Sequence, residues 1–244
     1  MPKPINFPAS GSRWFDFRAE KADSVDLYIY DVVGDSWTGN DAAALVKEIS
    51  NYKKKHVNVR INSPGGSVFD GVAIYNAIKS HEGGATTYID GLAASIASII
   101  ALASDRVVMA DNAMMMIHNP SVLSFGEAKD LRKDADTLDQ IKETLINTYA
   151  AKTKKEREKI AADMDAETWF TASEALAYGL VSEISSPMKA AACVSQSVAE
   201  TLGFRRAPES LFKAQAEPSA KTIFPTVPRS LLERRLALME KETQ

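Results

Sequence analysis

The chain has 244 residues, of which 45% are hydrophobic and 25% charged, which suffices for one well-packed α/β domain and an appendage. Its formal net charge of −3 argues against a nucleic-acid partner, because neutralising a phosphate backbone concentrates Lys and Arg on one face. The single cysteine, Cys193, excludes an intrachain disulfide, and three histidines leave little material for a Cys/His metal site. We therefore expect no metal or other cofactor and a reducing compartment.

The N-terminal part of the chain predicts neither export nor a membrane anchor. Residues 1–21 lack the uninterrupted apolar core of a signal peptide, and no later stretch reaches the roughly 18 apolar residues that span a bilayer. We expect a cytoplasmic protein without a membrane partner. Residues 1–24 carry Pro and Ser without a clear period and predict an irregular arm, although Trp14, Phe15 and Phe17 are costly to expose.

Strand and helix patterns alternate between residues 25 and 118. Runs rich in β-branched or aromatic residues predict strands at 25–33, 57–63, 85–90, 106–110 and 113–118. Helical spacing predicts helices at 39–49, 67–81 and 92–104, and the last of these is apolar all round, as a buried helix is. This alternation indicates an α/β fold with a layered core.

Helices dominate after Pro120, and three capping-box spacings predict where they begin. Ser124 with Glu127 opens a long helix, and Thr153 with Glu156 opens a shorter one. A third box, Thr171 with Glu174, opens a helix that stops at Gly179. The long helix carries one apolar stripe, made of Ala128, Leu131, Ala135, Leu138, Ile141 and Leu145. This stripe would be exposed unless another subunit covers it, so we expect a homo-oligomer.

The domain is expected to span residues 25–185, with the run at 180–184 returning to the sheet. Residues 186–244 then form an extension with an Ala-rich short helix, a proline-bearing linker and a charged terminal helix at 230–242. The linker prolines are Pro208, Pro218, Pro225 and Pro228. We expect this extension to lie outside the core.

Ser95 is the candidate nucleophile. A serine hydroxyl is weak at neutral pH and needs a base and donors for the developing oxyanion. Ser95 follows residues 91–94 (GLAA) at the start of the buried helix, where free N–H groups favour negative charge. The motif is not the G-x-S-x-G elbow, and a serine among alanines can simply pack a helix, as Ser98 and Ser104 would.

His118 is the candidate base. It ends an apolar strand and precedes Asn119 and Pro120, where a strand opens into a loop, although a hydrogen-bonded core histidine would fit the same pattern. His56 and His81 look like solvated residues at helix ends, so elimination favours His118. The glycine turn at 62–67 could supply oxyanion N–H groups, and it lacks the lysine of a phosphate-binding loop.

Four motifs in order resemble the proteolytic subunit of Clp-type peptidases. They are INSPGGSV at 61–68, GLAASIAS at 91–98, MMMIHNP at 114–120 and TWFTASEALAYGLV at 168–181. The resemblance covers residues 25–185 and implies the ClpP/crotonase-like fold of stacked strand-turn-helix units. The long helix after His118 resembles the handle through which two rings of subunits meet, which implies homo-oligomeric rings.

The same resemblance implies roles for particular residues. Ser95 would be the nucleophile and His118 the base, and the N–H groups of Gly66 and Ile96 would form the oxyanion hole. A polypeptide substrate would lie as an extended strand against Gly66, Ser67, Val68 and Phe69.

The third catalytic member departs from the family pattern, which has an aspartate two positions before an aromatic residue. If Trp169 is that aromatic residue, the position belongs to Glu167, whose extra methylene changes its reach. If Phe170 is the aromatic residue, Thr168 takes the position. Asp165 is a third candidate, and solvent exposure of both acids is the alternative to any catalytic role.

The predicted function is a serine endopeptidase working through a Ser95 acyl-enzyme. The long extension resembles the Clp-like peptidases of tailed phages, which implies prohead or capsid maturation, with scaffold or capsid proteins as substrates in the host cytoplasm or inside the prohead. A housekeeping Clp subunit with a separate ATPase is the alternative. An acyl-CoA enzyme of the crotonase architecture and an inactive scaffold or shell component are the other function classes considered.

Overall fold

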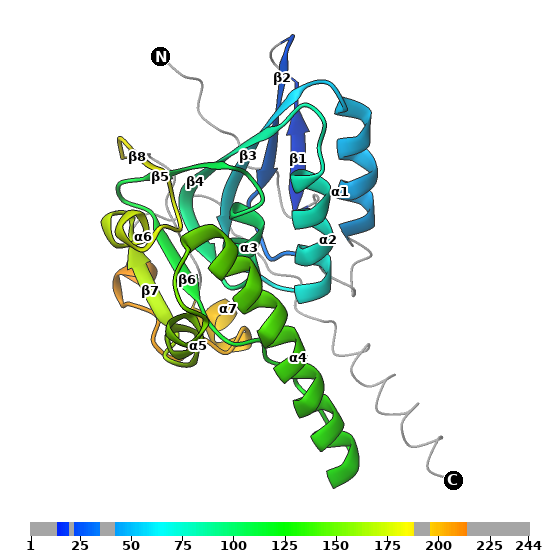
Figure 1. Ribbon diagram of the computed structural model, residues 1–244, viewed down its shortest axis with the longest axis vertical. Helices are drawn as coiled ribbons and strands as arrows, with labels where there is room; N and C mark the ends of the chain where they lie inside the picture. The colour runs from blue at the N-terminus through cyan, green and yellow to red at the C-terminus, as the bar shows by residue number, and fades with distance from the viewer. Residues whose placement is uncertain (1–13, 20–21, 35–41, 188–195, 214–244) are drawn as a thin grey trace. The chain divides into compact units, whose positions relative to one another are not determined.

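The structure is a computed structural model that describes residues 14–19, 22–34, 42–187 and 196–213. These residues belong to one compact unit, Arg13–Ala214. Within them, a single eight-stranded sheet carries helices on its faces, so the predicted α/β class is confirmed (Figure 1). None of the described helices combines the length and apolar character that crossing a bilayer requires.

The sheet has the order β1-β2-β3-β4-β5-β8, and β6 pairs with β4 and β7. The strands are β1 (Phe15–Arg18), β2 (Ser24–Ile29), β3 (His56–Ser63), β4 (Ala85–Ala94), β5 (Arg106–Ala110), β6 (Met114–Ile117), β7 (Thr168–Thr171) and β8 (Glu183–Ser185). β1 corrects the expectation of an irregular arm over residues 1–24, because it pairs antiparallel with β2. Trp14 and Phe15 are buried there, and the free energy of burying them offsets the conformational entropy that the chain loses when it forms this strand.

Strand β4 is longer than predicted. Its first half pairs in parallel with β3 and β5, and after a register shift its second half, Leu92–Ala94, pairs in parallel with β6. The predicted helix at 92–104 was therefore too long, and α3 covers only Ile96–Ala101. The reason is that residues 92–94 are buried on all sides, and an apolar run without period fits a buried strand as well as a buried helix.

The other helices are α1 (Ala42–Ile49), α2 (Val68–Lys79), α4 (Ala128–Thr153), α5 (Arg157–Asp165), α6 (Ala172–Tyr178), α7 (Gln196–Thr201) and α8 (Ser210–Lys213). Helix α6 begins at the predicted Thr171 box and ends at Gly179, whose φ is 91°. Two predicted starts were wrong. Helix α4 is capped by Glu127, which forms a box with Asp130, and α5 follows Glu156, because Thr153 is still the last residue of α4.

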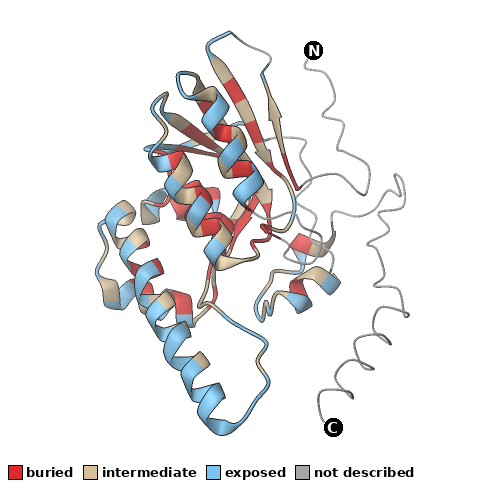
Figure 2. Ribbon diagram, turned by 90° about the vertical axis from the view of Figure 1, so that its right-hand side faces the viewer, coloured by how far each residue is buried: buried red, intermediate tan, exposed pale blue. Residues whose placement is uncertain are grey.

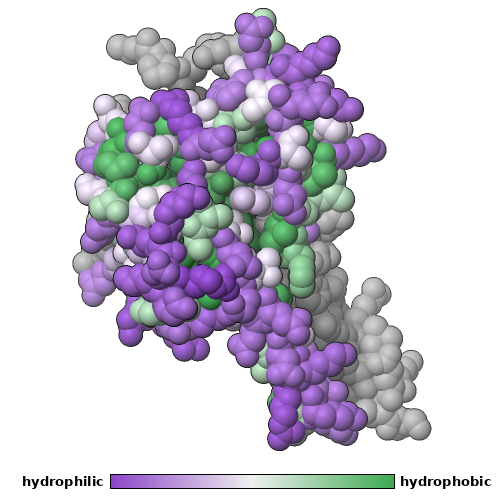
Figure 3. Space-filling model, viewed as in Figure 1, coloured by the Kyte–Doolittle hydropathy of each residue, from purple (hydrophilic) through white to green (hydrophobic). Residues whose placement is uncertain are grey.

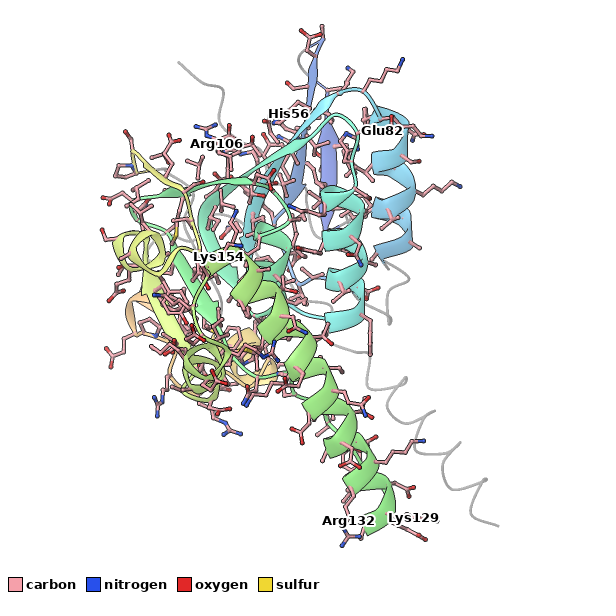
Figure 4. All side chains as sticks on the ribbon, viewed as in Figure 1. His56, Glu82, Arg106, Lys129, Arg132 and Lys154 are labelled. Carbon is pink, nitrogen blue, oxygen red and sulfur yellow. The ribbon has the colours of Figure 1, made fainter. Side chains whose placement is uncertain are left out.

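Helix α4 projects from the sheet (Figure 1). Its last turns are packed through Leu145, Ile146 and Tyr149, whereas its first half is exposed (Figure 2). The face of the projecting end seen in Figure 3 is mostly hydrophilic, and Lys129 and Arg132 extend from this end into solvent (Figure 4). Of the predicted apolar stripe, only Ile141 and Leu145 therefore contact this chain's own core.

The extension was expected to lie outside the core, but part of it packs on the sheet. Ala199 and Leu211 are buried in a cluster with Leu92, Ala94 and Met116 of the sheet. The predicted terminal helix at 230–242 falls outside the described residues, as do three of the four linker prolines, Pro218, Pro225 and Pro228.

Candidate active site

Two adjacent parallel strands bring the predicted nucleophile and base together. Ser95 follows β4 and His118 follows β6, and these strands pair in the register Leu92 with Met114 and Ala94 with Met116. Since parallel strands end at the same edge of a sheet, the two residues emerge side by side. His118 Nε2 lies 2.8 Å from Ser95 Oγ, within hydrogen-bond distance.

The backbone at Ser95 is strained. Its φ of 54° and ψ of −131° are unusual for a residue with a side chain, and its hydroxyl does not cap α3. Behind it, Ser98 Oγ donates to the Ser95 carbonyl oxygen at 2.6 Å and lies 2.6 Å from the Tyr149 hydroxyl of α4. Ser98, interpreted from the sequence as a packing residue, therefore connects the nucleophile to the long helix. Sequence reasoning missed Tyr149, since no motif links it to Ser98.

The glycine turn packs directly on the nucleophile. A Cβ on Gly65 would come within 2.7 Å of Ser95 Cβ, and a Cβ on Gly66 would come within 2.1 Å of the Val33 carbonyl oxygen. Both positions therefore require glycine. Neither the Gly66 N–H nor the Ile96 N–H donates to another described residue. Ile96 is the first residue of α3, where an N–H has no partner within the helix. The backbone bonds between the glycine turn and Val33 use the Gly65 carbonyl oxygen and the Ser67 N–H instead.

The predicted substrate edge is only partly extended. Gly66 forms a parallel bridge with Val33, and Ser67 is the N-cap of α2. Val68 and Phe69 already belong to the first turn of that helix, whose N–H groups have no partner within the helix. The Phe69 side chain is 72% exposed.

The register between β6 and β7 positions Glu167 opposite His118. These strands pair antiparallel, with Ile117 opposite Thr168, so the next pair outward is His118 and Glu167. Glu167 is buried, with 8% of its surface exposed, and has a positive φ of 49°. Burial lowers the pKa of His118 below its ordinary value, and the Glu167 carboxylate opposes that shift by stabilising the imidazolium.

The other two candidates for the third member face elsewhere. Asp165 accepts hydrogen bonds from Asn119 Nδ2 at 2.7 Å and from Lys142 Nζ at 2.5 Å, which lower its pKa. Thr168 Oγ1 donates to the Asp163 carbonyl oxygen at 2.7 Å. Of the three, only Glu167 acts electrostatically on His118.

Sequence reasoning missed the groups that hold Glu167. Its carboxylate accepts from the backbone N–H of Arg205 at 2.6 Å, from that of Arg206 at 2.7 Å and from Trp169 Nε1 at 3.1 Å. The Phe204 ring stands edge-on to the His118 ring, with centroids 5.8 Å apart. No sequence signal could have found these contacts, because they depend on where the extension packs.

The remaining histidines have structural partners. His56 Nε2 lies 3.0 Å from Thr86 Oγ1, and His81 Nε2 lies 2.8 Å from the Lys55 carbonyl oxygen. In the part of the chain that the structure describes, no group of three or more His, Cys, Asp or Glu side chains could hold a metal ion.

Comparisons with known proteins show which family the chain is similar to. Residues 9–188 match the family model for Clp protease. The chain is 35% identical over 155 residues to an ATP-dependent Clp protease proteolytic subunit 3 from Rhodococcus jostii, covering 62% of this chain and 76% of the relative. It is 27% identical over 186 residues to a proteolytic subunit 1 from Salinibacter ruber, covering 75% of this chain and 80% of the relative.

A solved structure shares the fold. A mutant of ClpP1 from Listeria monocytogenes superposes with a TM-score of 0.59 at 25% identity, covering 66% of this chain and 91% of that one. The ClpP-like fold inferred from the four motifs is thus confirmed. The chain belongs to the Clp protease family and is a serine-type peptidase.

Proposed function

We propose that the chain is an endopeptidase in which Ser95 is the nucleophile, His118 the general base and Glu167 the third member. The observation that carries this proposal is the 2.8 Å contact between His118 Nε2 and Ser95 Oγ. A base must be neutral to accept a proton, and the lowered pKa of His118 keeps its imidazole neutral at physiological pH.

In acylation, Ser95 Oγ attacks the carbonyl carbon of the scissile bond while His118 Nε2 takes the hydroxyl proton. The carbonyl oxygen becomes an oxyanion that the N–H groups of Gly66 and Ile96 stabilise. The imidazolium, stabilised by the Glu167 carboxylate, then gives its proton to the leaving nitrogen as the C–N bond breaks. The amine product departs and an ester to Ser95 remains.

In deacylation, a water molecule takes the place of the amine. His118 removes one of its protons as the water oxygen adds to the ester carbonyl, and the same two N–H groups stabilise the second oxyanion. The bond to Ser95 Oγ then breaks, and His118 returns the proton to the serine. The enzyme is restored and the second product leaves as a carboxylic acid.

The substrate is proposed to be a polypeptide that binds in an extended form beside Gly66, Ser67, Val68 and Phe69. Main-chain hydrogen bonds to such an edge recognise a peptide without demanding a particular sequence. The exposed Phe69 side chain offers an apolar contact at the end of this edge.

We propose prohead or capsid maturation as the biological setting, with scaffold or capsid proteins as substrates. Support comes from the extension, since the family match ends at residue 188 while the described residues 196–213 pack beyond it on the catalytic unit. The housekeeping alternative is supported by the relatives, which are named as proteolytic subunits of ATP-dependent Clp proteases. An ATPase partner and a cytoplasmic location belong to that alternative.

A homo-oligomeric ring is proposed as the working form. The segment before α4 exposes Leu123 and Phe125, each at 84%, and Leu131 of α4 is 43% exposed. Three exposed apolar side chains gathered at the start of α4 are typical of a protein interface. A second copy of the chain, with the same apolar segment, would cover them.

Digestion of an unfolded polypeptide such as casein tests the peptidase proposal. We expect new N-termini without added ATP, and none with Ser95→Ala. The two settings differ for folded substrates. Cleavage of co-expressed capsid or scaffold protein without an ATPase supports maturation, whereas digestion only with a Clp ATPase and ATP supports the housekeeping function.

A further inference from the structure

The described part of the extension, residues 196–213, packs on the ends of the two strands that carry the catalytic pair. Its buried residues Ala199 and Leu211 contact Leu92 and Ala94 of β4 and Met116 of β6. Ser95 directly follows β4, and His118 directly follows β6. The extension is therefore anchored next to the site rather than at a remote surface.

A tight turn after α7 directs the chain back towards His118. Gly203 has a φ of 74°, and the Phe204 N–H bonds to the Ala199 carbonyl oxygen at 2.9 Å. This turn positions the Phe204 ring edge-on to both aromatic neighbours, with centroids 5.8 Å from His118 and 5.7 Å from Trp169. The next two residues then present consecutive N–H groups to Glu167.

Those N–H groups donate hydrogen bonds to both oxygens of the Glu167 carboxylate. Arg205 donates to Oε2 at 2.6 Å and Arg206 donates to Oε1 at 2.7 Å, while Trp169 Nε1 shares Oε1 at 3.1 Å. Short hydrogen bonds to an ionised acceptor are among the stronger ones in proteins. A carboxylate has about four lone-pair sites, so three donors leave one for the imidazole N–H of His118.

We propose that residues 204–206 of the extension are positioning residues of the active site, which fix the Glu167 carboxylate for His118. This inference rests on the proposed triad. Glutamate has one more rotatable bond than aspartate, and without external donors its carboxylate would be free to turn away from the His118 side of the site. Two backbone amides and one indole N–H restrain that extra freedom.

Proline substitutions test this directly, because proline removes a backbone N–H. We would compare Arg206→Pro with Arg206→Ala, and Arg205→Pro with Arg205→Ala, in the full-length chain. Each alanine variant keeps the N–H and is the reference for loss of the side chain. The readout is the rate of fluorophosphonate labelling at Ser95 as a function of probe concentration. This dependence separates the maximal labelling rate from the apparent affinity for the probe.

We expect each proline variant to label on the order of 10²-fold more slowly than its alanine reference, with unchanged apparent affinity, because the probe still binds while the base is misaligned. In a Glu167→Gln background the same substitutions should not lower the labelling rate any further, since the two amides act through the Glu167 carboxylate. A merely structural role of the segment would lower the rate in both backgrounds.

Truncations provide a second test that does not depend on a folded proline variant. A chain ending at residue 213 should label at the wild-type rate, whereas a chain ending at residue 187 should match Glu167→Gln. Equal rates for proline and alanine variants, or an equal further loss in the Glu167→Gln background, would overturn the inference. Absence of labelling in the unmodified protein would instead refute the proposed peptidase itself.

Discussion

At the scale of single residues, the site is flanked by two non-glycine residues with positive φ. Ser95 has a φ of 54° and Glu167 one of 49°. Such conformations cost about 1–3 kcal/mol each and persist only where neighbouring contacts enforce them. Backbone hydrogen bonds hold both residues. The Ser95 N–H donates to the Met116 carbonyl oxygen at 3.0 Å and its carbonyl oxygen accepts from the Ser98 hydroxyl, and the Glu167 N–H donates to the Met164 carbonyl oxygen at 3.1 Å.

Replacing Glu167 by glutamine should slow the reaction and shift its pH dependence. The carboxylate raises the pKa of His118, so its loss lowers that pKa further and moves the acidic limb of the rate profile to lower pH. The plateau rate should fall on the order of 10²- to 10⁴-fold, because the imidazolium loses its counter-charge. Fluorophosphonate labelling measured from about pH 4.5 to about pH 8.5, roughly two units to either side of an ordinary histidine pKa, reads out both effects.

Asp165→Asn is the matched control for that prediction. Asp165 already binds Asn119 and Lys142, so its variant should keep the plateau rate and the position of the limb. A large loss with Asp165→Asn and none with Glu167→Gln would exchange the roles of the two acids.

Removal of the Tyr149 hydroxyl should slow acylation moderately. Tyr149→Phe leaves Ser98 bonded to the Ser95 carbonyl but without its second partner. One buried hydrogen bond is worth about 1 kcal/mol, which corresponds to a rate loss of about fivefold if it is realised at the nucleophile. Tyr178→Phe, which removes a hydroxyl bonded to Asp163, should change stability without changing the labelling rate.

At the scale of elements, the interior of the sheet is held by a buried charge cluster across three strands. Asp90 of β4 is 1% exposed and accepts from Arg60 of β3 at 2.6 Å and from Tyr30, which follows β2. Burial raises the pKa of Asp90, and the Arg60 guanidinium opposes that shift. The cluster thus joins the strands that lead to the glycine turn and to Ser95.

Removing one partner of this cluster should destabilise the fold. Arg60→Met leaves the Asp90 carboxylate buried without its cation, and breaking a buried pair in this way costs about 3–5 kcal/mol. Chemical denaturation with urea measures the change. Lys79→Met, which breaks the exposed pair with Asp105, is the control and should cost under about 1 kcal/mol. Equal effects would show that the buried cluster contributes little.

Periodicity and turn chemistry predicted most elements but not all of their limits. Alternation and capping signals located the strands β2 to β6 and the helices α2 and α6, since these depend on local residues, whereas β1 and β7 were not predicted as strands. The end of β4 could not be located, because the apolar run from Leu92 to Ala94 is continued into a strand only by pairing with β6. The start of α4 at Glu127 was missed since two overlapping capping boxes compete there.

At the scale of the whole molecule, the pairing of Ser95 with His118 was predictable and the environment of Glu167 was not. Four ordered motifs pointed to the family, and the family match bears them out. The contacts of Phe204, Arg205 and Arg206 arise from the tertiary packing of a segment beyond that match. Two of those contacts use backbone N–H groups, which leave no trace in the sequence.

Charge substitutions in the exposed apolar segment should weaken self-association. Leu123→Asp and Phe125→Asp would place a charge at surfaces that we propose are covered by a second copy. Sedimentation velocity should show a shift towards smaller species. Leu176→Asp, at an exposed leucine of α6, is the control and should leave the oligomer intact. Unchanged assembly in all three variants would contradict this interface.

Fluorophosphonate labelling of the full-length protein, with the modified residue identified by peptide mass spectrometry, tests the central claim most directly. The account predicts a single adduct on Ser95, formed quickly by the native protein, lost with Ser95→Ala and strongly slowed with His118→Ala. An intact, folded oligomer that forms no adduct on Ser95, or an adduct that persists at an unchanged rate without His118, would contradict it.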